Sequence, residues 1–149
     1  MADVVMRPKR IDRKSAPVPQ VVATAFEGQA VLWALDAIED ETGSLASLDF
    51  AKLGFAPVRA FTIGARDGAE RGGHGHYKGR QLLLLNSGRV TCELCRDDTR
   101  LSWELGGARR ALLIGPGIWS RQSFHGHQPA ITVLCDTPYD PDSYFECAQ

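Results

Sequence analysis

Two histidines separated by one residue, His74 and His76, are the side chains of this sequence best suited to chemistry. Successive side chains of a β-strand point to opposite faces, so both imidazoles of a His-x-His pair point to the same face. In a small barrel that face is either the lumen or the solvent side. Two imidazoles in a lumen form a candidate site, because histidine exchanges protons near neutral pH and also binds metals.

The residues around the pair follow a regular spacing. Five residues separate Gly68 from His74, four separate His76 from Gln81, and six separate Gln81 from Gly88. A second motif, Gly-Pro-Gly-Ile-Trp-Ser at residues 115–120, begins 34 residues after Gln81. The two motifs resemble those of the cupin β-barrels, with Gln81 in place of a glutamate and Ser120 in place of a third histidine. The resemblance implies an all-β fold, a single-domain cupin of the jelly-roll type, built as an antiparallel β-barrel.

These two replacements bear on metal binding. A metal-binding cupin uses two histidines, a glutamate and a third histidine, whereas Gln81 is neutral and Ser120 is a poor ligand for a divalent transition metal. We therefore expect no metal, and we expect His74 and His76 to act as acid–base or hydrogen-bonding groups. Two alternatives stay open. The histidines either only fill the barrel, or they bind a metal with a rearranged third ligand, His125 or His127, as in a cupin oxygenase.

Composition narrows the class of protein. The chain has 149 residues, a net charge of −1 and a sequence pI near 6.4, which fits one domain and implies no broad basic surface. We therefore expect no nucleic-acid partner. The sequence has no 18-residue apolar run and no signal-peptide pattern at its start, so we expect no membrane partner and a cytoplasmic location. The Cys-x-x-Cys at residues 92–95 has no second pair that would complete a zinc site.

The order of segments favours a barrel or sandwich. Residues 1–25 are expected to form a flexible N-terminal lead, and residues 26–149 the cupin domain. The segment 29–38 fits a helix or a strand. Short β-like segments follow at 58–63, 81–85, 89–96, 100–105, 111–114, 119–124 and 131–135, separated by turn signals that include residues 65–75. Many short strands with glycine-rich turns are typical of these folds.

With both motifs placed, the chain resembles a group of cupins, the nucleotide-sugar 3,4-ketoisomerases. The match spans about residues 37–145, in order and with nearly constant spacing. The group has Asp-x-Arg-Gly-x-Leu, Pro-Phe-x-x-Arg-x-x-Tyr, Arg-Gly-x-His-Ala-His-Lys, Pro-Pro-Gly-x-Trp-His and a late Tyr-Asp-x-x-Asp-Tyr. The corresponding segments here are Asp40–Leu45, Phe55–Phe61, Arg71–Lys78, Gly115–Trp119 and Tyr139–Tyr144.

The resemblance implies an isomerase that acts on dTDP-4-keto-6-deoxyglucose, without a cofactor, as a homodimer in the cytoplasm. It implies that His76 is the principal acid–base group and that His74 orients or shuttles protons. For the cation that stabilises the enediolate, Arg71 is the nearest candidate in sequence, and Arg59 and Arg121 are the others. The expected substrate-binding residues are Arg59, Gln81, Trp119, Ser120 and Arg121.

The chain also departs from the group. Thr42 replaces the arginine of the first motif, Phe61 or Thr62 replaces the strand tyrosine, and Ser120 replaces the histidine after Trp119. In the group these positions lie near the sugar. A divergent or catalytically inactive cupin that binds a sugar nucleotide is therefore the second hypothesis.

Overall fold

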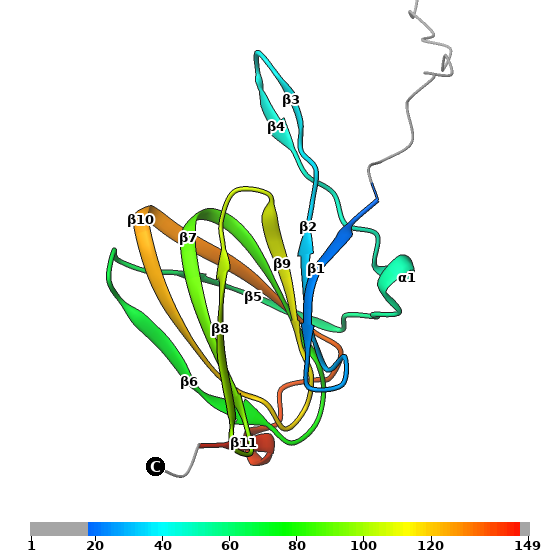
Figure 1. Ribbon diagram of the computed structural model, residues 1–149, viewed down its shortest axis with the longest axis vertical. Coiled ribbons are helices and arrows are strands. Elements are labelled where there is room, and N and C mark those ends of the chain that lie inside the picture. The colour runs from blue at the N-terminus through cyan, green and yellow to red at the C-terminus, as the bar shows by residue number, and fades with distance from the viewer. Residues whose placement is uncertain (1–17, 147–149) are drawn as a thin grey trace, which may run out of the picture.

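The computed structural model describes residues 18–146 and consists almost entirely of antiparallel strands (Figure 1). This confirms the predicted all-β fold. The strands are β1 (Gln20–Ala25), β2 (Ala30–Ala34), β3 (Ile38–Asp40), β4 (Gly43–Leu45), β5 (Arg59–Gly64), β6 (Glu70–His76), β7 (Gln81–Arg96), β8 (Thr99–Leu105), β9 (Arg109–Ile114), β10 (Trp119–Cys135) and β11 (Tyr144–Phe145). Two short helical turns, α1 (Phe50–Leu53) and the 3₁₀ turn Pro141–Ser143, complete the fold.

Two long strands, β7 and β10, run antiparallel to each other and belong to both walls of the barrel. The first half of β7 and the last residues of β10 lie in one wall, together with β1, β2, β5 and β9. Their other halves lie in a second wall with β8, β6 and β11. The two walls face each other, so side chains that point inward from both meet in one lumen.

Gly88 lies where β7 passes from one wall to the other. Its φ is +73°, a conformation that strains residues with a side chain. An added Cβ would also lie 2.7 Å from the carbonyl oxygen of His125 and 2.7 Å from the Pro129 Cβ. The register between β7 and β10 shifts at this level, between His125 and Ala130. The glycine therefore allows the two long strands to bend together.

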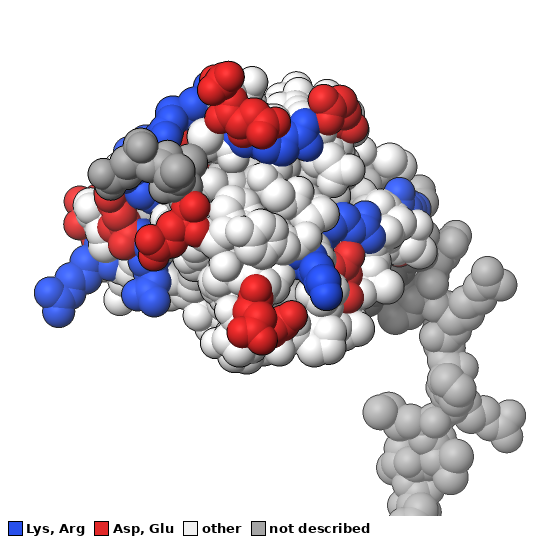
Figure 2. All heavy atoms as spheres, turned by 90° about the horizontal axis from the view of Figure 1, so that it is seen from below, with Lys and Arg blue, Asp and Glu red and all other residues white. Residues whose placement is uncertain are grey.

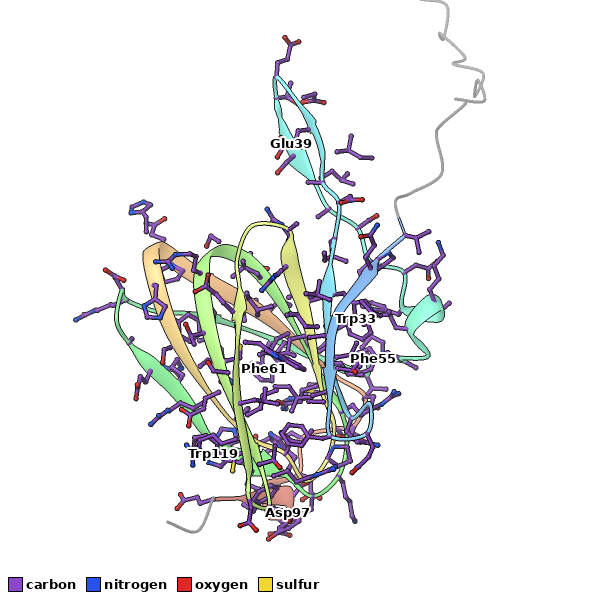
Figure 3. All side chains as sticks on the ribbon, viewed as in Figure 1. Trp33, Glu39, Phe55, Phe61, Asp97 and Trp119 are labelled. Atoms are coloured by element: carbon purple, nitrogen blue, oxygen red, sulfur yellow. The ribbon has the colours of Figure 1, made fainter. Side chains whose placement is uncertain are left out.

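Apolar side chains fill most of the lumen and cover one outer face. Leu32, Val90, Leu112, Phe124 and Ile131 are among the buried residues of the inner cluster, each with no exposed surface. The outer cluster lies under α1 and the loop that follows it: Trp33, Leu35, Phe55, Leu82, Ala111 and Leu113 (Figure 3). At one end of the lumen the lining is polar, and this end contains the candidate site described below.

The structure corrects several boundaries. Residues 1–17 lie outside the described residues, but Gln20–Ala25 form β1 and pair with β2, so the folded part begins before residue 26. Of the two possibilities left open for segment 29–38, the structure shows the strand, β2. The pairs of segments 81–85 with 89–96 and 119–124 with 131–135 are two continuous strands, because Gly88 and the register shift bend them without ending them.

The largest correction concerns residues 65–75, which the glycine pattern assigned to a turn. Glu70–His76 form β6, paired with β10. Gly72 and Gly73 adopt φ values of +85° and +81°, so the glycines produce an irregular strand rather than a loop. None of the described helices is long and apolar enough to cross a membrane.

The inner cluster generates a stability prediction. Phe124→Ala should lower the free energy of unfolding by about 3–5 kcal/mol, because it leaves a cavity among fully buried side chains. The control is Val58→Ala, at a side chain that is 64% exposed, where the change should stay within about 0.5 kcal/mol. Chemical denaturation of the two variants checks this, and equal midpoints would contradict the assigned core.

Candidate active site

His74 and His76 occupy alternate positions of β6, and the pairing of β6 places a polar partner opposite each. Ser120 of β10 lies opposite His74, and Tyr144 of β11 lies opposite His76. Directly opposed residues of antiparallel strands point to the same face. The ring centroids of His74 and His76 lie 5.4 Å apart at an interplanar angle of 83°. The two imidazoles therefore share one side of the wall.

The face they share is the polar end of the lumen. A cavity of about 270 Å³ is lined there by His74, Gln81, Ser120 and Tyr144, together with Arg59 and apolar residues of β5, β7 and β10. Gln122 donates a hydrogen bond from Nε2 to the Ser120 Oγ at 3.0 Å and closes the cavity on the β10 side. The lining contains two arginines and no carboxylate. Such a cavity favours a ligand that carries or develops negative charge.

His76 is held in its neutral form by its surroundings. The Gln81 Nε2 lies 3.1 Å from the His76 Nε2, and an amide nitrogen can only donate, so the ring nitrogen accepts. Burial lowers the pKa of His76, and electrostatic interactions with His74 and Arg59 lower that pKa further. A neutral imidazole at pH 7 is the form that can act as a general base.

Arg59 lines the cavity and acts electrostatically on His76. It extends from β5, and its guanidinium lies over the Phe61 ring at 4.8 Å and over the Tyr139 ring at 5.0 Å. Its Nη1 lies 4.0 Å from the Sγ of Cys135, which also lies 3.8 Å from the Gln81 Nε2. Burial is the main cause that raises the pKa of the Cys135 thiol. Stacking on two rings holds the positive charge of Arg59 at the cavity.

The structure separates the other expected residues into two groups. Arg71 is exposed and lines the cavity from the far part of β6. Trp119 and Arg121 flank Ser120 on β10, so they point to the opposite face of the strand and do not line the cavity. Arg121 binds Glu93 instead, at 2.7 Å from Nη2 to Oε2, and packs against Trp119. The structure does not bring these two residues to the histidines.

Tyr144 is the cavity residue to which the sequence assigned no role. Its ring lies 4.9 Å from the His74 ring and 4.4 Å from the His76 ring, measured between centroids. Its place in the late Tyr-Asp-Pro-Asp-Ser-Tyr motif was the available signal. Thr42, in contrast, lies in the β3–β4 hairpin, which projects from the barrel (Figure 1), and bonds only to Asp40 in the described structure.

The third ligand considered for a metal is not brought to the pair. His125 bonds to the Thr91 Oγ1 at 3.3 Å and His127 is exposed, and neither lines the cavity. Within residues 18–146 no group of three or more histidine, cysteine, aspartate or glutamate side chains is arranged to hold a metal ion.

A second cavity, of about 320 Å³, adjoins the first and shares Arg59, Gln81 and Tyr144 with it. The rest of its lining is His76, Lys78, Gly79, Arg80, Cys135, Thr137, Pro138, Tyr139, Asp140 and Ser143, so this cavity includes one carboxylate, that of Asp140. Figure 2 views the molecule from the end that carries β11, where charged side chains of both signs surround an uncharged middle. The ion pair Arg80–Asp136, at 2.8 Å, ties the loop that follows β10 to the start of β7.

The family comparison matches nearly the whole chain. The model of the family described as "FdtA: WxcM-like, C-terminal" matches residues 29–148. The chain belongs to this family. No curated protein sequence matches the chain closely enough to count as a relative.

Solved structures of the same fold agree with the family. The sugar 3,4-ketoisomerase QdtA from Thermoanaerobacterium thermosaccharolyticum, in complex with TDP, is 26% identical with a TM-score of 0.72, over 80% of this chain and 88% of that one. The TDP-quinovose 3,4-ketoisomerase WlaRB from Campylobacter jejuni is 26% identical with a TM-score of 0.69, over 79% and 92%. The dTDP-4-dehydrorhamnose 3,5-epimerase of Bacillus anthracis, at 17% identity and a TM-score of 0.74 over 85% and 82%, shares the fold.

The family and these matches support an enzyme of the isomerase class. The structure gathers His74, Arg59, Arg71, Gln81 and Ser120 around the lumen cavity, and it places His76 with Arg59 and Gln81 in the lining of the adjoining cavity.

The electrostatics of the site predict the titration of His76. Its pKa, followed by NMR of the ring, should lie below the ordinary value of 6.5. His74→Gln should raise this pKa by removing a neighbouring charge, yet leave it below 6.5, because burial is the larger cause. His127→Gln, at an exposed ring, is the control and should change nothing. A pKa at or above 6.5 in the unmodified protein would contradict this description.

The same shift predicts a pH dependence of stability. Since the folded pKa of His76 is lowered, the unfolded chain binds more protons between that pKa and 6.5. The free energy of unfolding should therefore rise with pH through this window and lose this contribution to the slope above 6.5. Denaturation of the parent and of His76→Gln across the window checks the sign. An equal slope in both proteins would assign the dependence to another group.

Proposed function

We propose that this chain is a nucleotide-sugar isomerase that moves the keto group of dTDP-4-keto-6-deoxyglucose between carbons 4 and 3. The observation that carries the proposal is the contact between two histidines at adjoining cavities. His74 lines the lumen cavity, which has two arginines and no carboxylate, and His76, whose pKa is lowered, lines the adjoining cavity. Family membership supports the reaction class. A variant of QdtA with one histidine changed to asparagine has been solved in complex with TDP-4-keto-6-deoxyglucose, which supports this choice of substrate.

The reaction needs a base and a stabilised oxyanion. His76 removes the proton from carbon 3, the electrons of that bond form the carbon–carbon double bond, and the oxygen at carbon 4 takes up a proton. The resulting enediol loses a proton from the oxygen at carbon 3 and gains one at carbon 4. No electrons leave the sugar, so the reaction requires no redox cofactor. Arg59 is the cation best placed to stabilise the enediolate, and Arg71 is a second one at the rim.

The second hypothesis is a sugar-nucleotide-binding cupin without turnover. The observation in its favour is Ser120, whose hydroxyl is engaged by Gln122 and which replaces a histidine of the ketoisomerase pattern. Both hypotheses predict binding of dTDP. Only the enzyme exchanges the carbon 3 proton with deuterated water and produces the 3-keto sugar, so NMR of the sugar after incubation separates the two.

His76→Asn tests the proposed base. The variant should lower turnover by about 100-fold or more, the usual scale for loss of a positioned acid–base group. Affinity for dTDP should stay nearly unchanged, because the nucleotide is held away from the reacting carbons. His127→Asn is the matched control, since this histidine is exposed and lines no part of the cavity. Unchanged turnover in His76→Asn would remove His76 from the mechanism.

A homodimer remains part of the proposal. β1 lies at the edge of its sheet, with Val21 60% and Val22 40% exposed. An apolar edge strand of this kind is a surface that a second copy can cover. Light scattering at micromolar concentration should therefore give twice the chain mass, and a monomer would refute the pairing. The cytoplasmic location and the absence of a cofactor stay predictions from the sequence.

A further inference from the structure

The proposed reaction moves protons on oxygen as well as on carbon, and this inference rests on that reaction. The oxygen at carbon 4 must gain a proton while carbon 3 loses one, and the oxygen at carbon 3 must later lose its own. A base that works on the carbons cannot donate to an oxygen in the same step. The site therefore needs a second group that both donates and accepts. A phenol hydroxyl has both capacities.

The strand register places one phenol at this point. Tyr144 lies opposite His76 in the β6–β11 pair, so its side chain points to the same face as the histidine. Its ring contacts both imidazoles, with centroids 4.9 Å and 4.4 Å away. Among the lining residues of the lumen cavity it is the sole tyrosine, and it also lines the adjoining cavity.

The neighbouring residue holds Tyr144 in place. Phe145 lies opposite Gly75, the residue between the two histidines. A Cβ on Gly75 would lie 2.3 Å from the Cζ of Phe145 and 2.7 Å from the carbonyl oxygen of Ile118. The ring of Phe145 therefore occupies space that is open only because residue 75 has no side chain. Alternation along the strand then turns Tyr144 to the histidine side.

Hydrogen bonds fix the segment that leads into β11. The backbone N–H of Tyr77 donates to the carbonyl of Ser143 at 2.8 Å, and the backbone N–H of Lys78 donates to the Ser143 Oγ at 3.1 Å. Ser143 is 6% exposed. These bonds join the segment to the residues that follow β6. The next strand, β11, pairs with the end of β6, and both lie at the lower end of the barrel in Figure 1. Tyr144 thus has a defined position relative to the histidines before any substrate arrives.

We propose that Tyr144 is the acid–base group for the two substrate oxygens, and that Phe145, packed in the space left by Gly75, positions it. When His76 takes the carbon 3 proton, the Tyr144 O–H gives its proton to the oxygen at carbon 4. The phenolate then accepts the proton from the oxygen at carbon 3, which restores the phenol, while protonated His76 gives its proton to carbon 4 and returns to the neutral form. Each proton has a donor and an acceptor, and no oxidant is consumed.

Tyr144→Phe tests the hydroxyl alone, since the ring and its contacts remain. Turnover and carbon 3 exchange in deuterated water should both fall by about 100-fold or more, because enediol formation needs a proton on oxygen. Affinity for dTDP should stay within about twofold, since the ring is retained. His127→Asn is the control, at a side chain that is exposed and lines neither cavity, and it should retain parent activity.

The outcomes distinguish a failure of the proposed role of Tyr144 from a failure of the proposed isomerase activity. Parent-like turnover in Tyr144→Phe overturns this inference and leaves the proposed isomerase intact, with Ser120 or His74 as the oxygen acid. A parent protein that binds dTDP but neither exchanges the proton nor moves the carbonyl overturns the proposed function, and the role of Tyr144 falls with it. The thermal unfolding midpoint of each variant identifies a loss caused by misfolding.

Phe145→Ala tests the positioning part. It should lower kcat by at least about tenfold through misplacement of Tyr144, with dTDP affinity unchanged. Phe145→Leu, which refills much of the space, should recover most of the rate. In a Tyr144→Phe background, Phe145→Ala should cost little more, because there is no hydroxyl left to position. A full additional loss in that background would show that Phe145 acts on the barrel in general and not through Tyr144.

Discussion

The antiparallel pairing of β7 with β10 is the interaction on which the rest of the structure depends. β8 and β9 pair with β7, while β5 and β6 pair with β10, so both walls are assembled on these two strands. Their joint bend at Gly88 turns one pair of strands into two facing walls. Because successive side chains of a strand point to opposite faces, the place of a residue along its strand decides whether its side chain points into the lumen. Ser120 and Gln122 point inward, and their neighbours Trp119 and Arg121 cannot.

The sequence predicted the fold, and it predicted that the two histidines share a face, for a physical reason. Strand periodicity fixes which residues share a face, and His74 and His76 share one whatever the details of the barrel. Parity also explains one failure: Trp119 and Ser120 are adjacent on a strand, so they could not both face the substrate. That conflict was present in the sequence, but the motif resemblance concealed it.

Other features of the structure could not be predicted from the sequence, because they depend on contacts between residues far apart in the chain. Glycines at positions 72 and 73 indicate a turn by composition, yet the pairing of β6 with β10 keeps these residues in a strand. Tyr144 reaches the histidines only because the chain returns to β6 after residue 143. Local propensity contains no information on such a return. The stacking of Arg59 on Phe61 and Tyr139 is of the same kind.

The replacement of a glutamate by Gln81 gives the cavity its electrostatic character. A carboxylate at this position would raise the pKa of His76 and offset the charge of Arg59. The amide instead bonds to the ring of His76 without adding charge. His76 therefore stays a neutral base near the positive charge of Arg59, an arrangement suited to an intermediate that becomes anionic during the reaction.

β11 forms part of the site wall but little of the barrel. It pairs with β6 over two residues, and the apolar clusters of the core contain no residue beyond Cys135 in the described part of the chain. Substitutions at exposed positions of this segment, such as Tyr139, can thus alter the reactive surface without opening a cavity in these clusters. In evolutionary terms, such a barrel can exchange one reaction or sugar for another by drift in a short terminal segment, while its stability is under selection elsewhere.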